Sequence, residues 1–213
     1  MKPNILVIGS ATIDLAMKVK RIPQPGETVL GGVFLTSPGG KGANQAVAAA
    51  RFGAEVSLVG CLGDDMYGKQ ALENYRREGI NADHVRLATD AATAIATIMV
   101  DANGQNAIAV APGANFAMRV EDVNRARPLI ERCDILLLQL EIPMSCVRRA
   151  VEIAEELKKT IILNPAPAQL LDETILRSVS ILTPNESETE LLAGIPVRTD
   201  EQVRTAARHL RNL

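Results

Sequence analysis

A glycine-rich stretch at residues 37–53 contains the side chains best suited to bind a ligand. It reads Ser-Pro-Gly-Gly-Lys-Gly-Ala-Asn-Gln before an alanine-rich run, which predicts a turn that leads into a helix. Gly40 and Gly42 would let the backbone approach a ligand, and Lys41 and Asn44 would add hydrogen-bonding groups at a helix start, where free N–H groups favour oxygen-rich ligands. A tight packing turn with a solvated lysine is the alternative. A Walker A loop is excluded, because glycine follows the lysine.

Oxygen-bearing side chains follow most of the predicted strands. They are Asp14, Asp64, Asp65, Glu141, Asn164, Asn185 and Glu188. Ligands of open parallel sheets bind at the carboxyl ends of the strands, so we expect a row of acceptors along one edge, opposite residues 40–44. Acceptors beside a lysine suit a polyhydroxylated ligand, because each hydroxyl both donates and accepts. The alternatives are an Asx turn for Asp14 and a helix cap for Asp64 or Asp65.

The elements that position these groups alternate between strand and helix. Aliphatic runs predict strands covered on both faces at residues 4–9, 55–60, 134–140, 160–163 and 180–183. Helices are predicted from residue 46, at 66–78, 120–133, 143–159 and near 170–179, with two further helices after the last strand. Repeated strand–helix units imply an α/β fold in which helices sandwich a parallel sheet.

Two excursions interrupt this alternation. Short β-prone pieces at 17–22 and 28–35, and a hairpin at 94–111 that turns at Asn103-Gly104, predict one small β-sheet. Apolar residues on it, such as Phe34 and Ile108, indicate that it covers either the cleft of the core or another subunit. The predicted division is an α/β core of residues 1–14, 37–91 and 112–213 and a β lid of residues 15–36 and 92–111.

Composition argues against several classes of protein. A net charge of -2, no Trp, two Tyr and three Phe argue against a nucleic-acid partner. The first apolar run is too short for a signal peptide or membrane span, so we expect a cytoplasmic protein without a membrane partner. Cys61, Cys133 and Cys146 are odd in number and far apart, which favours buried thiols over a zinc site or disulfides. His84 and His209 have no sequence partner for a metal or base role.

Four motifs carry a family resemblance. They are Gly39-Gly40-Lys41-Gly42-Ala43-Asn44-Gln45-Ala46, Gln139-Leu140-Glu141, Leu163-Asn164-Pro165-Ala166-Pro167 and Thr183-Pro184-Asn185-Glu186-Ser187-Glu188. Through them the chain resembles the PfkB-type sugar kinases over the whole length present, and the combination points to the ribokinase group of that family. The resemblance implies a Rossmann-like ribokinase fold with a β lid. It also implies ATP-dependent transfer of a phosphoryl group to the 5-hydroxyl of D-ribose.

The resemblance further implies site residues and cofactors. Asn185 would contact ATP, Glu188 would organise Mg²⁺ through water, and K⁺ would bind outside this chain. The lid would close over the sugar and exclude water, which protects ATP from hydrolysis, and would pair with the lid of a second subunit in a homodimer. The residues that would hold the sugar are Thr12, Asp14, Gly40, Lys41, Gly42, Asn44 and Glu141.

Two departures from the family pattern bear on activity. Thr12 stands where the family usually has Asn, and its shorter side chain can make fewer hydrogen bonds to a sugar. The family's Gly-Ala-Gly-Asp motif, which supplies an anion hole and the catalytic aspartate base, is expected beyond Leu213. We therefore expect a core that is incomplete at its C-terminal end and exposes apolar surface. Such a chain would be a fragment of a longer kinase or a short form that needs a partner chain.

Two alternatives stay open at this point. A kinase of the same family could act on 2-deoxyribose, fructose or a nucleoside instead of ribose. A chain without the catalytic base could instead be a non-catalytic module that binds a sugar or dimerises. Comparing turnover on each sugar distinguishes a ribose kinase from a kinase for another sugar. Sugar binding without ADP release would indicate the non-catalytic module.

Overall fold

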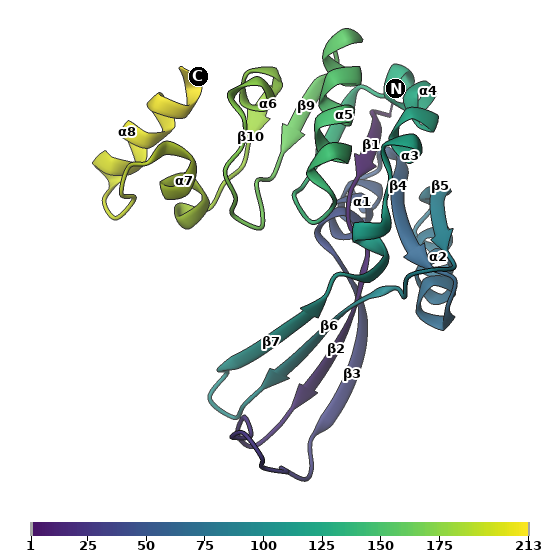
Figure 1. Ribbon diagram of the computed structural model, residues 1–213, viewed down its shortest axis with the longest axis vertical. Coiled ribbons are helices and arrows are strands. Elements are labelled where there is room, and N and C mark those ends of the chain that lie inside the picture. The colour runs from purple at the N-terminus through teal and green to yellow at the C-terminus, as the bar shows by residue number, and fades with distance from the viewer. Residues whose placement is uncertain (1, 213) are drawn as a thin grey trace.

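Two β-sheets organise the computed structural model, which describes residues 2–212 (Figure 1). The larger sheet is parallel throughout and has the strand order β10-β9-β8-β1-β4-β5. Met1 and Leu213, the two ends of the predicted core, lie outside the described residues. The strands are β1 (Asn4–Ile8), β4 (Glu55–Gly63), β5 (Asn81–Ala88), β8 (Ile135–Leu138), β9 (Thr160–Leu163) and β10 (Ile181–Leu182).

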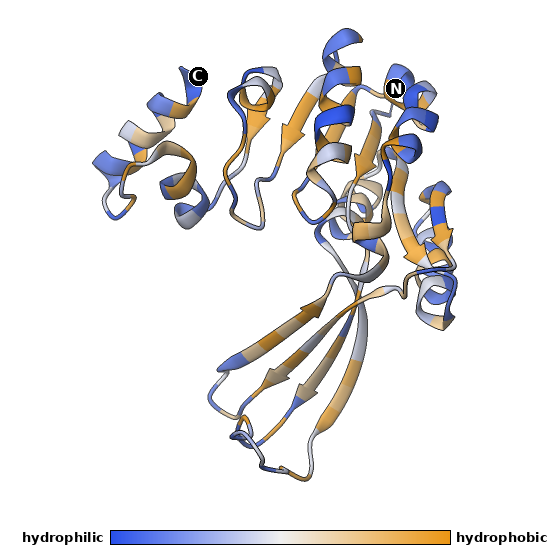
Figure 2. Cartoon of the chain, in the orientation of Figure 1, coloured by the Kyte–Doolittle hydropathy of each residue, from blue (hydrophilic) through white to orange (hydrophobic). Residues whose placement is uncertain are grey.

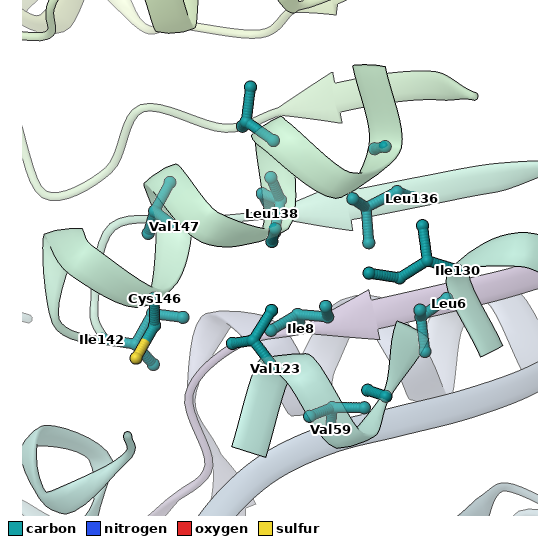
Figure 3. Close-up of a cluster of buried hydrophobic side chains, with 14 of the residues drawn as sticks. Leu6, Ile8, Val59, Val123, Ile130, Leu136, Leu138, Ile142, Cys146 and Val147 are labelled. Atoms are coloured by element: carbon teal, nitrogen blue, oxygen red, sulfur yellow. The ribbon is translucent and has the colours of Figure 1, made fainter. Parts of the chain in front are cut away.

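Helices cover both faces of the larger sheet, which confirms the predicted α/β sandwich. Side chains alternate along a strand, so Val7 of β1 packs with α1 and α2, whereas Leu6 and Ile8 pack with α3, α4 and α5. Figure 3 shows the second cluster, where Leu6 and Ile8 lie with Val123 and Ile130. The helices are α1 (Lys41–Arg51), α2 (Met66–Arg77), the 3-10 helix η1 (Gly113–Ala117), α3 (Val120–Arg125), α4 (Arg127–Arg132), α5 (Met144–Glu156), α6 (Glu173–Ser178), α7 (Glu186–Ala193) and α8 (Asp200–Arg211).

The core differs from the sequence prediction at two points. The single helix predicted at residues 120–133 is two helices, α3 and α4, because Pro128 lacks the N–H that a continuous helix would use. The sequence does not predict β5, whose residues form no continuous apolar run. This strand lies at the edge of the sheet and is fully buried only at Val85 and Ala88, so its sequence is under little pressure to be apolar.

The second sheet, called the small sheet below, consists of β2 (Thr12–Lys18), β3 (Val33–Gly39), β6 (Ala94–Val100) and β7 (Asn106–Ala111). Its order is β3-β2-β6-β7; β2 and β6 are parallel, and both outer pairs are antiparallel. Figure 1 shows these strands extending away from the helices, and Figure 2 shows many apolar residues along them. The predicted joining of the two excursions into one sheet is confirmed. Gly104 has the positive φ, 80°, that favours glycine in the hairpin turn.

The first excursion is longer than the sequence predicts. The β-prone pieces predicted at 17–22 and 28–35 are strands at 12–18 and 33–39, joined by residues 19–32. Asp14 does not interrupt β2, because the alternating pattern Thr-Ile-Asp-Leu-Ala-Met-Lys runs through it. The small sheet therefore begins inside segments that the prediction gives to the core. The division into core and lid remains a prediction.

Strand β10 is one of the two outer strands of the larger sheet within residues 2–212, at the end opposite β5. A groove of about 590 Å³ lies beside it, formed by α6, β10, α7 and α8, with Leu176, Leu182 and Val203 among its lining residues. Ile181 on this strand is 49% exposed. Apolar surface is thus accessible at this end of the sheet.

Two further findings concern the expectations from composition. Cys61, Cys133 and Cys146 are free and buried, as predicted. In the part of the chain that the structure describes, no helix has the length and apolar character needed to cross a membrane.

Candidate functional site

The turn after β1, the start of α1 and the turn after β8 meet at the carboxyl end of the larger sheet. Strand β1 pairs with β8, so Ser10 and Glu141, which follow these strands, lie side by side. Ser10 Oγ donates to Glu141 Oε2 at 2.6 Å, and the Lys41 backbone N–H donates to the same oxygen at 3.1 Å. The Lys41 ammonium group pairs with Glu141 Oε1. These three residues form what we call the Lys41–Glu141 cluster.

Hydrogen bonds within this cluster favour the ionised form of Glu141. Burial acts to raise the pKa of this carboxyl group, but the hydrogen bonds from Lys41 and Ser10 together outweigh burial, and the pKa is lowered. The side chains of Lys41 and Glu141 are still 39% and 27% exposed, so a ligand can reach both. The cluster therefore offers a donor and an acceptor to the same space.

Two glycines bring α1 against the turn after β1. Gly40 precedes α1 with a φ of 89°, and a Cβ on it would lie 2.8 Å from Ala11 Cα. A Cβ on Gly42 would lie 2.6 Å from the backbone nitrogen of Ser10. Without it, the Gly42 N–H donates to Ser10 Oγ at 3.3 Å, and the Ala43 N–H donates to Ser10 O at 2.8 Å. The glycines are thus required by backbone packing, whether or not a ligand is bound.

Asp14 lies inside β2 and not past the end of a strand, which corrects the prediction and excludes the Asx turn. It pairs with Ser37 of β3 and Ala96 of β6. Its carboxylate lies over Gly39, where a Cβ would be 2.4 Å from Asp14 Oδ1. Burial, and then the negative charge of Glu141, raise the pKa of Asp14. The two carboxylates repel each other, and a ligand that donates to both would offset this repulsion.

Thr12 and Asn44 lie on the two elements that flank the cluster. Thr12 begins β2, is 7% exposed, and pairs with Gly39 and Ala94. Asn44 lies in the first turn of α1, where its side chain is exposed and its N–H donates to Gly40 O at 2.9 Å. Six of the seven residues predicted to hold the sugar therefore lie on β2, on α1 or directly before α1, and the seventh, Glu141, lies in the turn after β8. Their contact with a ligand stays a prediction.

Sequence reasoning misses three residues of this region. Ser10 is the first; its only signal is a polar residue just after an apolar strand. The other two are Ala96 and Val110, which the cross-strand register places on the same face of the small sheet as Asp14. This register joins strands that are far apart in the chain, so no local pattern reveals it.

A capping box holds the start of α7. Asn185 Oδ1 accepts from the Glu188 N–H at 2.8 Å, and Glu188 Oε2 accepts from the Asn185 N–H at 2.9 Å. Asn185 Nδ2 also donates to Glu188 Oε1 at 3.0 Å, so both oxygens of this buried carboxylate have a protein donor. In the described residues, no hydrogen bond joins this pair to the Lys41–Glu141 cluster, and β9 and β8 separate β10 from β1.

These contacts bear on the predicted magnesium and ATP sites. Each oxygen of Glu188 keeps a second lone pair, which can accept a hydrogen bond from a metal-bound water. Between Lys2 and Asn212, no three His, Cys, Asp or Glu side chains are grouped as a metal ion requires. Asn185 is exposed at the start of the helix. The roles of both residues toward ATP and Mg²⁺ stay predictions.

Two of the acceptors expected at the sheet edge bind the protein itself. Asp65 caps α2, where its Oδ1 accepts from the Gly68 N–H at 2.8 Å, so the capping alternative is confirmed for this residue. Asn164 Nδ2 donates to Thr183 O at 2.9 Å and joins the ends of β9 and β10. Among the acceptors expected at this edge, Asp14 and Glu141 are brought together beside Lys41, whereas Asp64 pairs with Lys69 of α2.

Known proteins resemble this chain in sequence and in structure. It is 39% identical over 207 residues to the ribokinase of Haemophilus influenzae, an alignment that covers 97% of this chain and 68% of that protein. It is 38% identical over 208 residues to the deoxyribokinase of Salmonella typhimurium, again covering 97% of this chain and 68% of the relative. The solved structure of Arabidopsis thaliana ribokinase, complexed with ribose and ATP, matches with a TM-score of 0.89 and 32% identity, over 100% of this chain and 69% of that one.

The family model for the pfkB family carbohydrate kinases also matches this chain. It matches residues 2–212, nearly the whole sequence. The relatives named above are longer, and the chain spans 68–69% of their length. The family model, the ribokinase relatives and the matching structure agree, and this chain belongs to the pfkB family of carbohydrate kinases.

Proposed function

We propose that this protein is a ribokinase, which transfers the γ-phosphoryl group of ATP to the 5-hydroxyl of D-ribose. The observation that carries the proposal is Asp14 beside the Lys41–Glu141 cluster, because two carboxylates and an ammonium group then share one space. Such a set gives each hydroxyl of a sugar an acceptor or a donor. The similarity to ribokinases, one of them solved with ribose and ATP, supports the same assignment.

In this proposal the chain's own residues fix the sugar. Asp14 and Glu141 accept hydrogen bonds from its hydroxyls, while the Lys41 ammonium group and the Asn44 side chain donate to them. Gly40 and Gly42 keep the start of α1 close, and Thr12 offers a single hydroxyl. Phosphoryl transfer depends mainly on positioning and on stabilising charge, so rigid binding of the sugar supplies a large part of catalysis.

The small sheet acts as the lid in this proposal. Ala96 and Val110 place apolar groups beside Asp14, so closure over the sugar removes water from the site. Exclusion of water protects ATP from hydrolysis. Apolar residues on the other face of the small sheet pair with a second copy of the chain in a homodimer.

The nucleotide and ions complete the proposed enzyme. Asn185 contacts ATP, and Glu188 orders Mg²⁺ through water, in keeping with a carboxylate whose oxygens already accept protein hydrogen bonds. Bound Mg²⁺ neutralises charge on the phosphate oxygens. By family resemblance, K⁺ and the aspartate base belong to a segment that would follow Leu213, and the enzyme is assigned to the cytoplasm.

A coupled assay of ADP release, run on the complete kinase that includes the aspartate base, tests the proposal. D-ribose, 2-deoxyribose, fructose and a nucleoside are compared at equal ATP and Mg²⁺, and ribose is expected to give the highest kcat/KM. A 2-deoxyribose kinase is the second candidate, favoured by the 38% identity to a deoxyribokinase and by the short side chain of Thr12. Ribose as the poorest substrate would reject the proposal. Calorimetric binding of ribose without turnover would support a non-catalytic sugar-binding module.

A further inference from the structure

The chain passes four times between the larger sheet and the small sheet. These crossings form a neck at residues 11–12, 39–40, 93–94 and 111–113. The third crossing leads into β6, and there the carboxylate of Asp65 in the core holds Thr93. No sugar-binding residue proposed above takes part in this contact.

Both oxygens of Asp65 bind Thr93. The Thr93 N–H donates to Oδ2 at 2.7 Å, and the Thr93 hydroxyl donates to Oδ1 at 2.7 Å. Oδ1 also accepts from the Gly68 N–H at 2.8 Å, so one side chain joins the start of α2 to the start of β6. Thr93 is 3% exposed, which keeps water from competing for these bonds.

The arrangement of donors requires a carboxylate at residue 65. The Gly63 N–H donates to Thr93 Oγ1 at 3.0 Å, so the hydroxyl proton is free to point at Asp65. Thr93 and Gly68 thus bring only donors to Asp65. Burial acts to raise the pKa of Asp65, but the bonds from Thr93 and Gly68 together outweigh it and the pKa is lowered. An asparagine that keeps its oxygen on the Gly68 N–H would turn its NH₂ group toward the Thr93 N–H, which is also a donor.

Backbone packing leaves no space for movement at this crossing. A Cβ on Gly63 would lie 2.4 Å from the Thr93 nitrogen, and a Cβ on Gly113 would lie 2.3 Å from Ala92 O. The Ala114 N–H donates to Ala92 O at 2.8 Å. The strand entering the small sheet is thus enclosed by β4 on one side and by the returning chain on the other.

The contact reaches the proposed sugar site through strand register. Ala94, directly after Thr93, pairs with Thr12, and Ala96 pairs with Asp14. We infer that Asp65 and Thr93 are positioning residues that fix the direction of the small sheet and thereby hold Asp14 opposite the Lys41–Glu141 cluster. Movement of the lid then takes place by bending of the strands beyond the neck, and not by rotation at Thr93. Only the effect on sugar affinity rests on the proposed function.

Three variants test the inference. Thr93→Val removes the hydroxyl and keeps the shape, whereas Thr93→Ser keeps the hydroxyl. Asp65→Asn preserves the ability to cap α2, because asparagine is an equally good N-cap residue, so it perturbs the contact with Thr93 selectively. Amide hydrogen exchange of β2 and β6 is measured beside that of β1 and β8, and calorimetry gives the dissociation constant of ribose.

The expected result is local to the neck and the small sheet. Thr93→Val and Asp65→Asn should raise exchange in β2 and β6 and weaken ribose binding about tenfold or more, while β1 and β8 stay unchanged. Thr93→Ser should leave both the exchange in β2 and β6 and the ribose affinity as they are in the unmodified chain. Unchanged exchange in β6, or an equal rise in β1 and β8, would overturn the inference. If the unmodified chain binds no ribose, the proposed function fails, and hydrogen exchange still decides the role of Asp65 and Thr93.

Discussion

Two carboxylates, Asp14 and Glu141, lie close together and have pKa values shifted in opposite directions. Glu141 accepts hydrogen bonds from Ser10 and Lys41, and these outweigh the effect of its burial. For Asp14, burial and the charge of Glu141 both favour the protonated form. Donors on a bound sugar would therefore change the ionisation of Asp14 more than that of Glu141.

Replacing Asp14 by Ala tests the sugar site at the scale of one residue. The variant should weaken ribose binding by about 1.5–3 kcal/mol, the range for hydrogen bonds to a charged group. Calorimetry measures the affinity, and Asp83→Ala on β5, exposed at the far edge of the larger sheet, serves as the control. Equal ribose affinities in the two variants would remove Asp14 from the site.

The raised pKa of Asp14 predicts how sugar affinity depends on pH. Free Asp14 keeps its proton to a higher pH than an ordinary aspartate, and hydroxyl donors of the sugar favour its ionised form. Affinity should rise as the pH increases through the pKa of free Asp14, and binding should release protons in that range. Calorimetry in two buffers with different ionisation enthalpies measures the release. The release should vanish in Asp14→Asn; persistence there would assign the proton to another group.

At the scale of elements, the start of α1 depends on two glycines that are packed against the turn after β1. Gly40 combines a φ of 89° with a close neighbour, whereas Gly53 after the same helix has a φ of 92° and no atom within 4 Å of a Cβ. Comparing alanine substitutions at Gly40 and Gly53 therefore separates the energetic cost of the backbone conformation from the cost of steric overlap. Both contribute to how firmly α1 is held beside Glu141.

Gly40→Ala and Gly53→Ala measure these two costs. Gly53→Ala should lower the free energy of unfolding by about 1–2 kcal/mol, from backbone conformation alone. Gly40→Ala should lose about 1–3 kcal/mol more, because the new Cβ overlaps the backbone of residues 11 and 12. Urea unfolding provides both values. Equal losses would mean that the turn after β1 yields to accommodate the methyl group.

Local patterns predict much of the fold and less of the site. Aliphatic runs predict β1 and β9, because strands buried on both faces need apolar residues throughout. The Asn103-Gly104 turn predicts the hairpin, because its residue types suit the tight turn. Strand β5 leaves none, since one edge strand can be polar. The place of Asp14 within β2, and the contact of Ser10 with Glu141, depend on tertiary pairing that no short window of sequence contains.

At the scale of the whole molecule, the small sheet presents two different faces. The register puts Val110 on the face of Asp14, whereas Phe34 and Met17 lie on the opposite face. Val110 is 61% exposed and Phe34 is 58% exposed, so both faces present apolar surface. One face would cover the sugar, and the other would contact a second copy of the chain.

Charged substitutions on the two faces should have different effects. Phe34→Asp should convert the proposed dimer to a monomer in sedimentation velocity and leave ribose affinity unchanged, because it would bury a charge in the proposed interface. Val110→Asp should keep the proposed dimer and weaken ribose binding about threefold to tenfold, since it places a negative charge two strands from Asp14. The reverse pattern would exchange the roles of the two faces.

The parallel pairing of β2 with β6 also constrains how the chain folds during synthesis. These are the two central strands of the small sheet, yet the ribosome makes residues 12–39 well before residues 94–111. Until the second hairpin emerges, β2 has one unpaired edge, and a lone two-stranded hairpin is marginally stable in water. Assembly of the small sheet must therefore wait for the segment that contains β4, α2 and β5, which makes its closure a late, long-range step of folding.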